Sequence, residues 1–148
     1  MSYNNVERKL ELAIKSVITR KYDTIPGHVG HANDSVALPH YTIHSPSSKE
    51  GIYDTGTLIV EVEVKVKSDA DTSSTDGSPS DHYEREGAIF DAILTSPQSD
   101  FVGDLNTSGV EEFTAFRCKE VGRMSGIEGR AFVSTLRLQV ICCGSIIS

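Results

Sequence analysis

The clearest pattern in this sequence lies over 58–67, LIVEVEVKVK, where every even position is apolar and every odd position from Glu61 onward is charged. Successive side chains of a strand point to opposite faces of a sheet, so this run predicts a strand with one apolar face and one charged face. The apolar face takes every second residue from Leu58 to Val66. The charged face takes Glu61, Glu63, Lys65 and Lys67. One face therefore belongs to the core, and the other belongs to the surface or to an interface between subunits.

The N-terminal segment has the spacing of an amphipathic helix. Apolar residues recur every three or four positions after Val6. Asn4, followed three residues later by Glu7, resembles a capping box, in which the two side chains cap the first turn. The pattern predicts a helix over about residues 5–20.

Two more helices are expected in the second half of the chain. Asp81 with Glu84 has the form of a second capping box, and the apolar stripe behind it predicts a helix over about 81–95. The next serine is followed by Pro97, which suits an N-cap with proline at the first helical position. A short third helix should follow and end at Asn106.

Strands are expected on both sides of these helices. The segment 40–45, HYTIHS, is short but rich in β-prone residues, and 112–121, EFTAFRCKEV, is a stronger strand candidate. The run 131–143 alternates like the strand at 58–67. Between the last two strands, 121–130 contains three glycines among few apolar residues, which predicts the loop of a hairpin.

Two polar segments interrupt this order. Residues 22–56 are rich in Pro, Gly, Asn and Ser outside the short strand candidate and predict a long excursion or arm. Residues 68–80 have no apolar side chain larger than Ala, so burial does not offset the cost of ordering them, and they predict a mobile loop. We expect one domain over residues 1–148, of class α+β, in which a mostly antiparallel sheet carries amphipathic helices on one face.

Composition and charge narrow the function classes. The content of 38% hydrophobic and 24% charged residues is ordinary for a globular domain, and the formal net charge of −7 disfavours a protein whose whole surface binds nucleic-acid phosphates. The chain has no apolar run of the roughly 18 residues that a membrane helix needs. We therefore expect assembly in the cytoplasm without a membrane partner.

The cysteines point to reduced thiols. Cys118, Cys142 and Cys143 make an odd count without the spacing of a disulfide framework. The two adjacent cysteines point to opposite faces if they lie in a strand, which disfavours both a mutual disulfide and joint metal binding. We interpret all three as small buried apolar residues.

The histidines give only weak evidence for a metal site. His28 and His31 are three residues apart, and His40 and His44 are four apart. On a strand the second pair shares a face but is separated by roughly 13 Å, too far for one ion. The acidic segment after residue 68 also lacks the glycine that an EF-hand loop requires at its sixth position. We expect no metal and no cofactor.

One enzymatic pattern is present in degenerate form. Asp54, followed on the next strand by Glu63 and Lys65, has the residue types of metal-dependent nucleases of the PD-(D/E)xK class, in which carboxylates hold Mg²⁺ near an attacking water. Glu63 and Lys65 share one face of the predicted strand. A solvated or interfacial row of mixed charge explains the same residues, so this nuclease is the alternative hypothesis, and we expect a protein that is not an enzyme.

Four elements over about residues 5–143 carry a family resemblance. They are the helix VERKLELAIKSVI, the strand GTLIVEVEVKVKSDAD, the helix HYEREGAIFDAIL and the terminal strand GRAFVSTLRLQVIC. Their order and the style of the strands resemble tail terminator and head-tail joining proteins of long-tailed bacteriophages. The segment 22–56 has no counterpart in that resemblance.

The resemblance implies a structural virion protein of the tail or neck. Members of the family are small α+β proteins that assemble into rings, commonly hexameric, and contact the tail tube protein or the head-tail connector while DNA passes transiently through the channel. In that setting the charged face of 58–67 is expected to contact sister copies. Complementary charges fix the register and specificity of such contacts more than their affinity.

Overall fold

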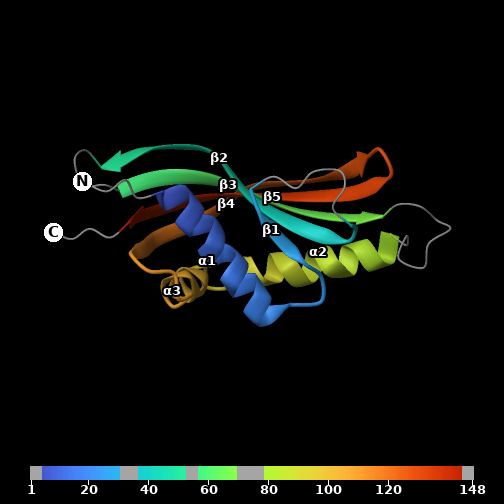
Figure 1. Cartoon of the computed structure of the whole chain (residues 1–148), viewed down its shortest axis with the longest axis horizontal. Helices are drawn as coiled ribbons and strands as arrows, with labels where there is room; N and C mark the ends of the chain where they lie inside the picture. Colours follow the sequence, from blue (N-terminus) through green and yellow to red (C-terminus); the bar gives the residue numbers. More distant parts are fainter. Residues whose placement is uncertain (1–4, 31–36, 53–56, 70–78, 145–148) are drawn as a thin grey trace.

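The computed structural model describes residues 5–30, 37–52, 57–69 and 79–144 (Figure 1). Its elements are, in chain order, α1 (Val6–Lys21), β1 (Gly27–Val29), β2 (His40–Ile52), β3 (Thr57–Asp69), α2 (Pro79–Ile93), α3 (Ser99–Asn106), β4 (Phe113–Glu128) and β5 (Ala131–Gly144). The strands form one five-stranded sheet in the order β1-β2-β3-β5-β4. Only the pairing of β1 with β2 is parallel. The predicted α+β class with a mostly antiparallel sheet is confirmed.

The helices lie on one side of the sheet, as the alternation in β3 requires (Figure 1). Val60, Val62, Val64 and Val66 are at most 1% exposed and form the centre of the core. They pack against a buried stripe of α1 that includes Leu10, Ile14 and Ile18, and against Ile89 and Ile93 of α2. Burial of aliphatic area on this scale is the main favourable contribution to folding.

The first helix begins one residue later than the sequence predicted. Its N-cap is Asn5, whose side-chain oxygen accepts a hydrogen bond from the backbone N–H of Arg8 at 2.9 Å. The expected capping box of Asn4 with Glu7 is therefore wrong. Glu7 instead accepts a hydrogen bond from the Ser48 hydroxyl at 2.8 Å.

The boundaries of the other two helices also differ from the prediction. α2 starts at Pro79, so Asp81 lies in its first turn and is not the N-cap. α3 starts at Ser99 rather than at Pro97, and its N-cap Gln98 makes no side-chain capping bond. The Thr95 hydroxyl accepts a hydrogen bond from the N–H of Phe101 at 3.1 Å, which ties the start of α3 to the end of α2. The predicted end at Asn106 is confirmed.

Much of the predicted excursion over 22–56 belongs to the sheet. β2 runs for 13 residues through a Ser-Pro-Ser-Ser segment with little intrinsic strand preference. Its pairing with β3 continues past a bulge between His44 and Ser47. Buried Glu11 of α1 accepts a hydrogen bond from the N–H of Ser45 at 3.0 Å, and this long-range contact orders the polar segment. β1 was missed altogether, because only three residues pair, with Gly27 packed directly against the Tyr41 ring.

The glycine-rich loop predicted over 121–130 is a strand through most of its length. β4 continues to Glu128, paired with β5, and only Gly129 and Arg130 form the turn. Gly129 has a φ of +59°, a conformation that glycine adopts without strain. Both ends of the mobile loop predicted over 68–80 belong to regular elements, because Ser68, which is fully buried, and Asp69 lie in β3, and α2 starts at Pro79. The rest of that prediction, residues 70–78, lies outside the described residues.

A histidine and two serines join α2 to the sheet. His82 is 2% exposed, and its ring nitrogens lie 2.8 Å from the Ser68 hydroxyl and 2.9 Å from the Ser134 hydroxyl. A neutral imidazole has one donor and one acceptor nitrogen, so both bonds form with the uncharged ring. Burial lowers the pKa of His82 and favours that uncharged form.

The cysteines are free thiols, and all three are buried. Burial raises the pKa of Cys118 and of Cys142 to about 12. They therefore behave as small apolar side chains of the core, as the sequence predicted.

Candidate subunit interface

The four charged residues predicted as contact residues lie on the face of the sheet opposite the helices. Glu61 is exposed, and Glu63, Lys65 and Lys67 are partly exposed, whereas their neighbours on the core side are buried. The structure thus places all four on one surface, which we call the open face. It is formed by alternate residues of β2, β3, β5 and β4.

The strand register arranges the open face in rows across the sheet. Directly opposed residues of neighbouring strands share a face, so each row follows from the pairing. One row is Lys49, Ile59, Ile141 and Arg117, and the next is Ser47, Glu61, Gln139 and Lys119. Further along the strands come the rows His44, Glu63, Arg137, Gly122 and Thr42, Lys65, Thr135, Met124. The open face therefore carries mixed charge over four strands, with isoleucines in one row.

Most positive charges of the open face have no acidic partner among the described residues of the chain. Glu63 and Arg137 form an ion pair at 3.2 Å across β3 and β5. Over the described part of the chain, no ion pair occurs for the remaining basic residues of the face, which are Lys49, Lys65, Lys67, Arg117 and Lys119. Exposed ion pairs contribute little to the stability of a fold, so the fold does not need these basic residues to be paired within the chain. Their charges are therefore available to a partner molecule.

Two bulges shape the middle of the open face. One interrupts β2 between His44 and Ser47, and the other interrupts β4 between Glu120 and Gly122. Bulges bend a strand and increase its twist. Between them lies a hollow of about 240 Å³ lined by residues of both bulges, Pro46 and Val121, and by the Glu63–Arg137 pair. This volume is below the roughly 300 to 1,000 Å³ of typical small-molecule sites, so the hollow suits a protruding side chain better than a substrate.

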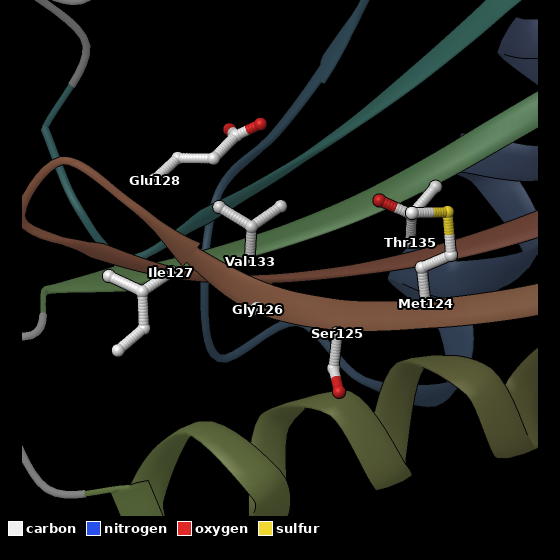
Figure 2. A pocket seen from close by; sticks show the side chains of 7 residues that line it. All are labelled: Met124, Ser125, Gly126, Ile127, Glu128, Val133 and Thr135. Atoms are coloured by element: carbon white, nitrogen blue, oxygen red, sulfur yellow. The ribbon is translucent and has the colours of Figure 1, made fainter.

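A second hollow lies at the far end of the β4–β5 hairpin. Figure 2 shows Met124, Val133, Thr135 and Glu128 on the side of the hairpin away from α2, and Ser125 pointing toward that helix. The hollow measures about 210 Å³. It lies in the rows of Lys65 and Lys67, on β5 and β4, and gives this end of the open face an apolar part.

The edge strand β4 is unusually apolar for an exposed strand. Its exposed large apolar residues are Phe116 (55%), Val121 (54%), Met124 (63%) and Ile127 (64%). β4 is the last strand of the sheet and pairs with β5 alone. The Asn106 side chain bonds the N–H and C=O of Ala115, and beyond that residue the outer edge of β4 has no partner strand in the described part of the chain. A long edge with apolar side chains and no proline is a site where another chain can add. Sequence reasoning missed this feature because it assigned residues 121–130 to a loop.

The histidines lie differently from the predicted pairs. His40 and His44 share the open face, as expected for a strand. Parallel pairing of β1 with β2 brings His28 beside His40, with ring centroids 5.6 Å apart, a proximity that their sequence separation does not indicate. Burial lowers the pKa of His40. Within the described residues, no group of three or more His, Cys, Asp or Glu side chains is placed to hold a metal ion. His31 lies outside those residues.

Two of the three residues of the nuclease hypothesis lie in β3. Glu63 and Lys65 do share the open face, but the Glu63 carboxylate is paired with Arg137. A guanidinium beside a carboxylate competes with a divalent cation for the same oxygen atoms. Asp54 lies outside the described residues, so the predicted triad stays a hypothesis.

Comparisons with known proteins identify no family for this chain. No model of a known protein family matches the sequence, and no curated protein is significantly similar to it. None of the helices in the described ranges is long and apolar enough to cross a membrane.

Proposed function

We propose that this chain is a structural protein of a virion, without catalytic activity, that assembles into a ring through the open face of its sheet. The observation that carries the proposal is the open face itself. Its unpaired basic residues and interleaved glutamates lie in ordered rows, while helices cover only the opposite face. A surface of this kind suits a protein partner better than solvent alone, because complementary charges select one register among many.

The place we propose for the ring is the neck or tail end of a long-tailed bacteriophage. The supporting observation is the element order, in which an amphipathic helix and a long strand precede a second helix and a long terminal strand. This is the order that carries the resemblance to tail terminator and head-tail joining proteins. The proposed partners are sister copies, in a ring that we expect to be hexameric, together with the tail tube protein or the head-tail connector.

The charge distribution of the open face favours protein over nucleic acid as the lasting partner. Glu61 and Glu63 lie between the basic residues, and carboxylates at these positions repel phosphate oxygens. Among the described residues, this face has no continuous track of basic residues of the kind that releases many counterions from DNA. DNA is therefore proposed only as a molecule that passes through the ring.

Mass photometry and light scattering over a range of protein concentrations test the proposal, with and without a tail tube protein. We expect a discrete oligomer that grows at the expense of the monomer as concentration rises, and joining of that oligomer to tubes. A chain that stays monomeric at all concentrations and never joins tubes would contradict the proposed function.

A further inference from the structure

A second charged surface lies on the other side of the molecule. Glu84 and Asp91 of α2 are exposed and seven residues apart, so they lie on one side of the helix, directly opposite its buried residues Ile89 and Ile93. Asp100 of α3 is exposed in the same helical layer, and both helices cover the side of the sheet opposite the open face (Figure 1). We call Glu84, Asp91 and Asp100 the acidic helix surface.

Two other acidic residues on this side of the molecule form ion pairs with α1. Lys21 of α1 pairs with Asp104 at 2.7 Å, and Lys9 pairs with Glu112 at 3.6 Å. No such pair is found for the acidic helix surface within the described ranges. Asp104 and Glu112 are thus paired inside the chain, whereas Glu84, Asp91 and Asp100 present their carboxylates at the surface.

The complementary charges lie at one end of the open face. Lys49 and Arg117 are the two ends of one row, and Lys119 ends the next row. Only Glu61 is acidic in these two rows, so this end of the face, which we call the basic end, is net positive. Ile59 and Ile141 lie between the charges and supply apolar area to the same patch.

We propose that the basic end of the open face binds the acidic helix surface of a second copy of this chain. The proposal rests on the proposed function and names the two surfaces that meet in the ring. Lys49, Arg117 and Lys119 pair with Glu84, Asp91 and Asp100 of the next copy, and exposed Tyr83 of α2 adds an aromatic contact beside them. Charge complementarity selects this pairing over contact between two open faces, because each open face has more basic than acidic residues.

The geometry of the two surfaces makes the contact heterologous. Because they lie on opposite sides of a two-layer molecule, each copy that binds through one surface leaves its other surface free. Contacts of this type continue from copy to copy and close into a ring when the rotation between copies permits it. A single kind of contact therefore generates the assembly.

Charge reversal tests the proposal by sedimentation velocity over a range of concentrations. The sheet variant carries Arg117→Glu and Lys119→Glu, and the helix variant carries Glu84→Lys and Asp91→Lys. Each variant alone has two surfaces of like charge, so we expect the midpoint concentration of assembly to rise by about tenfold or more. Circular dichroism checks that both variants are folded, since all four positions are exposed.

An equimolar mixture of the two variants is the decisive sample. The charge-reversed basic end of one variant then binds the charge-reversed helix surface of the other. In every second contact, the two unmodified surfaces bind each other. We expect the mixture to assemble at nearly the midpoint of the unmodified chain. A control with Lys15→Glu on α1 and Arg130→Glu in the β4–β5 turn has the same total charge change as the sheet variant and should assemble normally.

The outcomes separate the two proposals. A strictly monomeric unmodified chain overturns the proposed function and this inference with it. Normal assembly of the helix variant, or a mixture that stays dissociated, overturns the inference alone and points to a contact between open faces or to another surface. If the unmodified chain retains a DNA duplex that the sheet variant releases, while both variants assemble normally, the basic end serves nucleic acid and the inference is wrong.

Discussion

The helix-covered face and the open face of the sheet differ in how their side chains are constrained, although residues of the two faces alternate along the same strands. Leu136 is fully buried against the helices, and the next residue, Arg137, keeps 54% of its side chain exposed in a pair with Glu63. Close packing restricts the first kind of position to apolar residues of the right volume. A position on the open face is constrained only by the group that its side chain binds. The comparison teaches that one strand pattern stabilises the fold through one face and leaves the other for recognition.

Adjacent substitutions in β5 test this contrast with the largest expected effect. Leu136→Ala removes a fully buried side chain and should lower the free energy of unfolding by about 2–5 kcal/mol. Arg137→Ala removes one partner of a partly exposed ion pair and should cost less than about 1 kcal/mol. Urea denaturation of both variants, measured below the assembly concentration, provides the comparison. Similar losses at the two positions would contradict the division between the faces.

A smaller effect should appear in the pH dependence of stability. The pKa of His82 lies below its ordinary value of 6.5 mainly because of burial, with Glu86 raising it and Arg85 lowering it. Above pH 6.5 both the folded and unfolded states are neutral at this residue. Between pH 6.5 and the lowered folded pKa the unfolded chain holds the proton and the folded chain does not, so stability decreases by up to about 1.4 kcal/mol per pH unit as the pH falls through this range. Below the folded pKa both states are protonated and the decrease levels off.

Burial also lowers the pKa of His40. Replacing each histidine in turn separates the two contributions to the pH dependence of stability. In His82→Gln the slope of unfolding free energy against pH below 6.5 should be shallower, and His40→Gln should remove a second part. Thermal unfolding at several pH values measures both slopes. An unchanged slope in His82→Gln would show that the buried imidazole is not the group that takes up the proton.

The parts of the fold that could be predicted from sequence are those in which local pattern and tertiary packing agree. The alternation in β3 fixes its two faces, and the stripe after Val6 fixes α1, so the layer arrangement follows from periodicity. The faces of Glu61 and Lys67 were correctly assigned for the same reason. These features need no information from distant parts of the chain.

The errors occur where distant contacts override local composition. The polar half of β2 is held by β3 and by Glu11 of α1, and the glycine-containing half of β4 is held by β5. Neither partner is visible in a short window of sequence. The apolar edge of β4 and the proximity of His28 to His40 were missed for this reason, because both depend on which strands pair.

Lysine footprinting tests the central claim, that the open face is buried between copies, most directly. The assembled and monomeric forms are acetylated briefly, and modification of Lys65, Lys67 and Lys119 is measured by peptide mass spectrometry relative to Lys15 of α1. The account predicts that assembly protects the lysines of the open face several-fold while Lys15 reacts equally in both forms. Equal modification of Lys65, Lys67 and Lys119 in the two forms would contradict it.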